Sequence, residues 1–96
     1  MTADLEQKRR TVRVLELLGE SFKAHTHGDK LSSDSAVLDA MELDSAAMLV
    51  IQGGMMIGEI PNPERDWTGW LEYLAANQEG LARAEAEAAQ EGNDDA

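Results

Sequence analysis

The sequence predicts an all-α protein, a small three- to four-helix bundle. Hydrophobic residues make up 43% of the 96 residues but aromatic residues only 4%, so the core must consist mainly of aliphatic side chains, which suit helices. The two prolines, Pro61 and Pro63, lie close together and leave most of the chain free to be helical. Apolar residues also recur at helical spacing along long stretches of the chain.

The first helix is expected from Asp4 to about Ala24. Val14, Leu18 and Phe22 follow one another at intervals of four residues, while most charged side chains fall on the other side. Gly19 lies inside this stretch, where a glycine costs a helix about 1 kcal/mol relative to alanine. We therefore expect Gly19 to permit a close contact with another element.

A long first loop is expected from His25 to Ser35, because this stretch is rich in turn-forming residues, and a short irregular segment should follow it up to Leu43. His25 and His27 are two residues apart and could in principle share a metal ion. Asp29 is the nearest further ligand, and the spacing matches no known site. We expect no metal site here.

Asp44 and Ser45 stand where this segment gives way to an apolar run from Ala46 to Ile51. Both are favourable N-cap residues, because their side-chain oxygens accept the free N–H groups of a helix start. A helix start also favours an anionic phosphate. Ser45 is thus either a cap or the attachment point of a phosphate-linked group. Because the run 46–51 has no polar side chain, we expect this second helix to be central.

Pro61-Asn62-Pro63 should break the chain before a last helix that Asp66 caps. Trp67, Trp70 and Leu74 share one face of that helix, and we expect this face to close the core instead of binding a ligand. The helix should end at 77–80. Residues 79–96 contain one large apolar side chain and predict a frayed helix or a disordered acidic tail. The expected domains are a bundle over residues 1–78 and this tail over residues 79–96.

The net charge is −11, and residues 31–96 hold two basic and fourteen acidic side chains. Nucleic acid is therefore not an expected partner, whereas a basic protein is. The chain has no cysteine for a disulfide or a thiolate metal site. No signal peptide pattern and no apolar run of about 20 residues is present, so we expect no membrane association and a cytoplasmic location. No set of catalytic side chains is readable, and we expect no enzyme activity.

Four segments resemble the acyl carrier proteins and their aminoacyl and peptidyl carrier relatives. Leu38-Asp39-Ala40-Met41-Glu42-Leu43-Asp44-Ser45 is similar to the segment before the second helix of that family, with Glu42 in place of the usual glycine. Leu17-Leu18-Gly19-Glu20-Ser21-Phe22 resembles the end of the first helix. Gly58-Glu59-Ile60-Pro61 looks like the end of the second helix, and Trp67 to Leu74 like the last one. The resemblance covers about residues 5–76.

This resemblance implies a stand-alone acyl or aminoacyl carrier protein with 4'-phosphopantetheine attached to Ser45. The arm would hold a thioester-linked intermediate, as in polyketide or other specialised biosynthesis. Asp44 would help present Ser45 to a phosphopantetheinyl transferase. Leu43, Ala46, Met48 and Leu49 would contact the acyl chain or the loading and processing enzymes.

Two further expectations concern partners. The chain should be a monomer, although its apolar second helix would permit a dimer. The alternative function is an unmodified acidic helical adaptor that binds a basic partner protein through residues 31–96.

Overall fold

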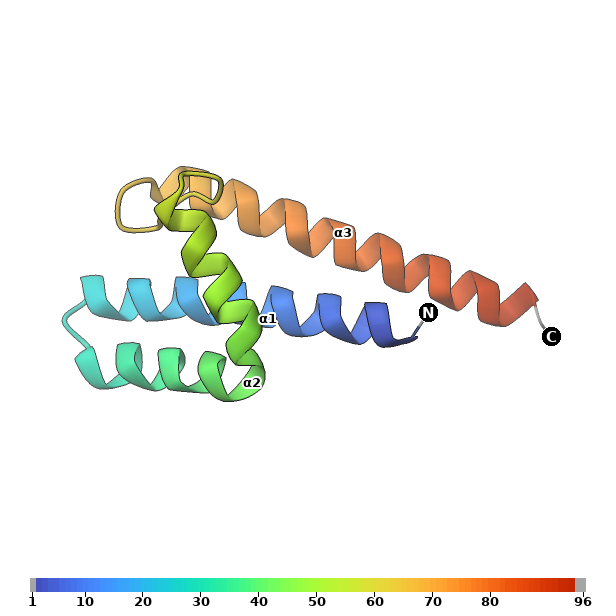
Figure 1. The fold of residues 1–96 in the computed structure, drawn as a ribbon, viewed down its shortest axis with the longest axis horizontal. Helices are drawn as coiled ribbons and strands as arrows, with labels where there is room; N and C mark the ends of the chain where they lie inside the picture. Colours follow the sequence, from blue (N-terminus) through green and yellow to red (C-terminus); the bar gives the residue numbers. More distant parts are fainter. Residues whose placement is uncertain (1, 95–96) are drawn as a thin grey trace.

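The computed structural model describes residues 2–94, and three helices make up most of this part of the chain. They are α1 (Thr2–Thr26), α2 (Lys30–Met56) and α3 (Trp67–Asp94), shown in Figure 1. No strand occurs among the described residues. The prediction of a small all-α bundle is confirmed.

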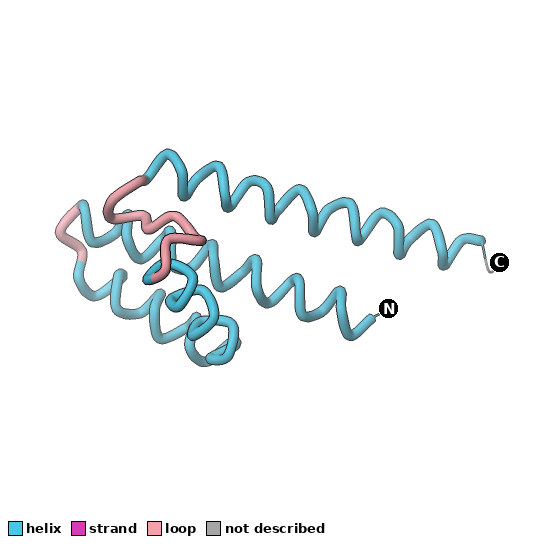
Figure 2. Tube along the Cα trace, turned by 45° about the horizontal axis from the view of Figure 1, so that its top comes forward, coloured by secondary structure: helices cyan, strands magenta, loops and turns pink. Residues whose placement is uncertain are grey.

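Helix α1 is the centre of the bundle, with α2 and α3 packed against it (Figure 2). Val14 and Leu15 of α1 are fully buried, as is Trp70 of α3. The sequence placed the segment after Ser45 at the centre, and this expectation is wrong. That segment turns Met48 toward the core but leaves Leu49 70% exposed.

The predicted long first loop is also wrong, because only residues 27–29 separate α1 from α2. Gly28 adopts a φ of 74°, which suits glycine and allows the sharp reversal. Asp29 then caps α2, since its Oδ1 accepts a hydrogen bond from the Ser32 N–H at 3.1 Å. The expected irregular segment up to Leu43 is instead regular helix.

The first part of α2 packs closely on α1 through small side chains. Ser33, Ala36 and Ala40 are buried and recur at helical spacing. Ser33 is also bonded directly to α1, because the Ser21 hydroxyl donates to its carbonyl oxygen at 2.9 Å. A helix that buries small residues brings its backbone close to its neighbour.

Asp44 divides α2 into two straight parts. Its φ of −161° and ψ of 89° are not helical, so residues 30–43 and residues 45–56 point in different directions. We call residues 45–56 the second half of α2. Figure 1 shows it crossing α1 at a steep angle.

Residues 57–66 lead from α2 to α3. Within this connection Ile60 packs so closely on Gly54 that a Cβ there would overlap its side chain. Asp66 caps α3, as predicted, because its Oδ1 accepts from the Gly69 N–H at 2.9 Å. The close contact expected at Gly19 is confirmed too, since a Cβ there would lie 2.9 Å from Trp70 Nε1.

Helix α3 does not end at 77–80 as predicted but continues to Asp94. Leu81 is half-buried, and Arg9 of α1 lies 3.5 Å from Glu85, so this part of α3 runs beside the first turns of α1. Fraying of the tail stays a prediction, and Asp95 and Ala96 lie outside the described residues.

Candidate functional site

The break in α2 at Asp44 creates a new helix start in the middle of the chain. Asp44 has an extended backbone, and its Oδ1 accepts a hydrogen bond from the Ala47 N–H at 3.0 Å. This is the geometry of an N-cap residue with its partner three positions later. Asp44 is therefore the cap, and the interpretation of Ser45 as the cap is wrong.

The Asp44 carboxylate is also tied to α1. Gln7 Nε2 donates to Oδ2 at 2.9 Å, and Arg10 Nε lies 3.5 Å from the same oxygen. The Ala47 N–H, then Gln7 and then Arg10, lower the pKa of Asp44 below its usual value. The carboxylate is consequently ionised and fixed at neutral pH.

Sequence reasoning missed Gln7 and Arg10. Gln7 is 37 residues away from Asp44 along the chain, on the first turns of another helix. Neither residue stands in a pattern that points to Asp44. Nothing in the local sequence could have found this pair, because the contact depends on how α1 and α2 pack.

Ser45 is the first residue of the second half of α2, and its side chain is exposed. Its hydroxyl makes no hydrogen bond to another residue in the described part of the chain. Because Asp44 has taken the capping role, the Ser45 oxygen remains accessible to a molecule from solvent. The N–H groups of the same helix start favour a negative charge beside it.

The four predicted contact residues lie at different depths. Leu43, Ala46 and Leu49 are exposed, the leucines by 40% and 70%. Met48 is buried between α2 and α1, with 3% of its surface exposed. Three of the four residues thus offer exposed apolar surface close to Ser45 along the chain, while Met48 belongs to the core.

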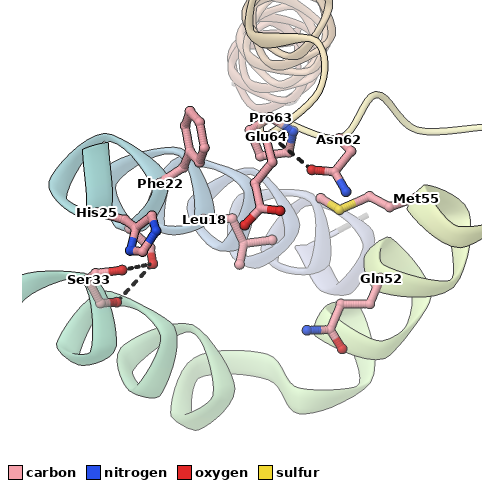
Figure 3. A pocket seen from close by; sticks show the side chains of 10 residues that line it. Leu18, Phe22, His25, Ser33, Gln52, Met55, Asn62, Pro63 and Glu64 are labelled. Atoms are coloured by element: carbon pink, nitrogen blue, oxygen red, sulfur yellow. Dashed lines mark hydrogen bonds between the residues drawn. The ribbon is translucent and has the colours of Figure 1, made fainter. Parts of the chain in front are cut away.

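A separate cavity of about 310 Å³ lies between α1, α2 and the 57–66 connection (Figure 3). Both apolar and polar side chains line it: Leu18, Ser21, Phe22, His25, Ser33, Gln52, Met55, Asn62, Pro63 and Glu64. The hydroxyls of Ser21 and Ser33 lie 2.9 Å apart at its wall. The cavity does not include Ser45 or the exposed leucines beside it.

The described residues contain neither a metal site nor a membrane-spanning helix. No three His, Cys, Asp or Glu side chains there could hold a metal ion together. His27, one of the two histidines considered above, instead places Nδ1 2.7 Å from the Lys23 carbonyl oxygen. Within residues 2–94, no helix has the length and apolar character needed to cross a membrane.

No family model, curated protein or solved structure matches the chain. The function must therefore be inferred from the geometry around Asp44 and Ser45 and from the segments quoted above.

Proposed function

We propose that this chain is a carrier protein that holds an acyl or aminoacyl group on a phosphopantetheine arm attached to Ser45. One observation carries the proposal. Ser45 presents an exposed hydroxyl, without a hydrogen bond to any other described residue, at the first position of a helix that the neighbouring Asp44 caps. Modification of the Ser45 hydroxyl would therefore leave the Asp44 cap of this helix intact.

The residues around Ser45 fit an attached phosphodiester. Its negative charge would lie at a helix start, where the free N–H groups and the helix dipole stabilise an anion. The Asp44 carboxylate accepts hydrogen bonds from the Ala47 N–H and Gln7 Nε2, and the Arg10 guanidinium offsets its charge. The group would therefore not meet an uncompensated carboxylate.

In the attachment reaction, Ser45 Oγ forms the new bond to phosphorus of coenzyme A. Its proton passes to the transferase, the pyrophosphate P–O bond of coenzyme A breaks, and adenosine 3',5'-bisphosphate leaves. When bound, the arm supplies a terminal thiol that carries the cargo as a thioester. This chain has no cysteine that could compete for that cargo.

The remaining parts of the site position the serine and its partners. Gln7 and Arg10 fix Asp44 on α1, and Asp44 in turn fixes the start of the second half of α2. Leu43, Ala46 and Leu49 offer an exposed apolar surface on which a transferase or a loading enzyme can dock. The acidic surface of residues 31–96 attracts basic enzymes from a distance.

The test is the intact mass of the chain after incubation with coenzyme A, Mg²⁺ and a broad-specificity phosphopantetheinyl transferase. The wild-type chain should gain one phosphopantetheine, and Ser45→Ala should gain none. Ser35→Ala is the matched control, because Ser35 is another exposed serine of α2, and it should be modified like the wild type. A mass gain that survives Ser45→Ala would refute the proposal, as would no gain in the wild type.

A second candidate function is the acidic helical adaptor, and a specific observation favours it. Asp34, Asp39 and Glu42 of α2 are exposed, and none forms an ion pair with another described residue. No basic side chain occurs between Leu31 and Glu64. A basic partner would bind this surface without contact with Ser45. Its binding should survive Ser45→Ala and weaken steeply with salt, because exposed charges are screened within about 10 Å at 0.1 M.

A further inference from the structure

The outward side of the second half of α2 is an apolar stripe. Its members recur at the spacing of one helix face, and we call them the outer stripe: Ala46, Leu49, Val50, Gly53, Met56 and Ile57. The four large side chains are 70–87% exposed. The opposite side of the segment already fills the core through Met48 and Ile51. The second half of α2 is thus apolar on two sides. The described residues cover the side with Met48 and Ile51 and leave the outer stripe exposed.

The outer stripe is symmetric about Gly53. Leu49 and Ile57 lie four residues before and after it, and Val50 and Met56 lie three residues before and after it. If a second copy packed antiparallel on the stripe with the two Gly53 residues at the centre, Leu49 of each copy would therefore face Ile57 of the other. Val50 of each copy would likewise face Met56 of the other. A twofold interface requires this self-matching, because each patch must fit itself.

Gly53 suits the crossing point of two such helices. A Cβ added at this residue would have no atom within 4 Å, so nothing in the chain itself fills the space above it. The neighbouring Gly54 differs, since Ile60 of the same chain occupies its surface. Two backbones can approach closely where both carry glycine.

The distribution of charge also favours a second copy. No residue from Ala46 to Gly58 is charged, so pairing of the outer stripe would bury no carboxylate. The segment is acidic before the stripe, where Asp39 and Glu42 are exposed. After the stripe, residues 59–66 carry three exposed acidic side chains and the exposed Arg65, so the charges lie beyond both ends of the stripe.

From these observations we infer that two copies of the chain associate through their outer stripes as an antiparallel dimer. The inference does not depend on the chemistry at Ser45 and replaces the expectation of a monomer. Because the stripe shares Ala46 and Leu49 with the proposed enzyme-docking surface, a docking enzyme would bind the monomer. Four large side chains per copy form a smaller patch than the roughly 800 Å² that each partner buries in a standard interface. The dimer should therefore be weak, with a dissociation constant of about micromolar or above.

Sedimentation equilibrium of the full chain measures this directly. The average mass should rise from monomer toward dimer with concentration. It should rise further with added salt, because each copy carries a net charge of −11 and salt screens the repulsion. A chain that stays monomeric at every concentration and salt level would overturn the inference. A dimer that dissociates with salt would also overturn it, since ion pairs would then hold the dimer.

A pair of complementary variants tests the register. Val50→Lys and Met56→Glu should each weaken the dimer at least about tenfold, because each places a charge against an apolar side chain. An equimolar mixture should restore association, since residue 50 of one copy faces residue 56 of the other. Leu31→Lys is the control. Leu31 is 85% exposed but lies outside the outer stripe, so this variant should dimerise like the wild type.

All of these positions are exposed, so at concentrations where the chain is monomeric circular dichroism should show unchanged thermal unfolding of the three variants. Dimerisation that is unaffected by Val50→Lys and Met56→Glu would contradict the inference. A mixture that associates no better than either variant alone would also contradict it. If the wild-type chain stays monomeric but binds a lysine- and leucine-rich amphipathic peptide, the stripe serves a basic partner and the dimer is refuted.

Discussion

Gly19→Ala and Trp70→Leu together test the packing of α3 on α1. A Cβ at residue 19 would lie 2.9 Å from Trp70 Nε1, and the indole is fully buried. The ring cannot retreat without moving the core around it. Overpacking of this kind costs about 1–3 kcal/mol, while alanine gains about 1 kcal/mol over glycine in a helix. Gly19→Ala should therefore lower the free energy of unfolding by up to about 2 kcal/mol.

The same substitution should act differently once the indole is removed. Trp70→Leu should itself cost about 3 kcal/mol, because it leaves a cavity where the largest buried side chain was. Beside that space a Cβ at residue 19 meets no ring atom, so Gly19→Ala should now stabilise the chain by about 1 kcal/mol. The two substitutions should couple by about 1–3 kcal/mol.

Urea unfolding followed by far-ultraviolet circular dichroism measures all four chains without depending on tryptophan fluorescence. Gly19→Ala should have opposite effects in the two backgrounds. If its effects agree within about 0.5 kcal/mol, the two sites are independent and the close packing of Gly19 on Trp70 is refuted.

Three further predictions use the same unfolding assay. Gly53→Ala should raise the free energy of unfolding by about 0.5–1 kcal/mol at concentrations where the chain is monomeric, because its Cβ meets open space. Gly54→Ala should lower the free energy of unfolding, because its Cβ meets Ile60. Equal effects of the two substitutions would contradict the packing of Ile60 on α2. Ser21→Ala should lower the free energy of unfolding by about 1–3 kcal/mol, because it removes the buried hydrogen bond to Ser33. The exposed control Ser35→Ala should stay within about 0.5 kcal/mol of the wild type. Similar losses of stability in both variants would disprove the role of the buried Ser21 hydroxyl. Hydrogen bonds lower the pKa of Asp44 below the ordinary 3.8, so its carboxylate stabilises the fold above that pH and this stabilisation is lost as pH falls through the folded pKa. Wild type should therefore lose more stability than Asp44→Asn between neutral pH and pH values below 3.8, and parallel pH profiles would refute the assigned bonds.

The parts of the fold that the sequence predicts are those that bury large side chains. Val14, Leu18 and Phe22 mark the buried side of α1, and Asp66 marks the start of α3 with its capping side chain. The first part of α2 escaped prediction because it buries serine and alanine, which give no pattern of large apolar residues. A usable signal was present, since Asp29 stands at capping distance before Ser32.

The candidate site divides in the same way. A helix start at Asp44 and Ser45 follows from their types and from the apolar run behind them. Which of the two is the cap depends on the backbone of Asp44, and only the packed structure defines that. Gln7 and Arg10 come from a distant helix, so no local pattern indicates them. The exposure of the outer stripe was not predicted, because an apolar segment without charges is expected to be buried on every side. Only the packed structure shows which of its sides is covered.

The location of any attached group tests the central claim most directly. The measurement is fragmentation mass spectrometry of the full chain after production together with a phosphopantetheinyl transferase. We predict one phosphopantetheine per chain, located on Ser45. A chain that remains entirely unmodified, or one that carries the group on another serine, would contradict the proposed carrier function.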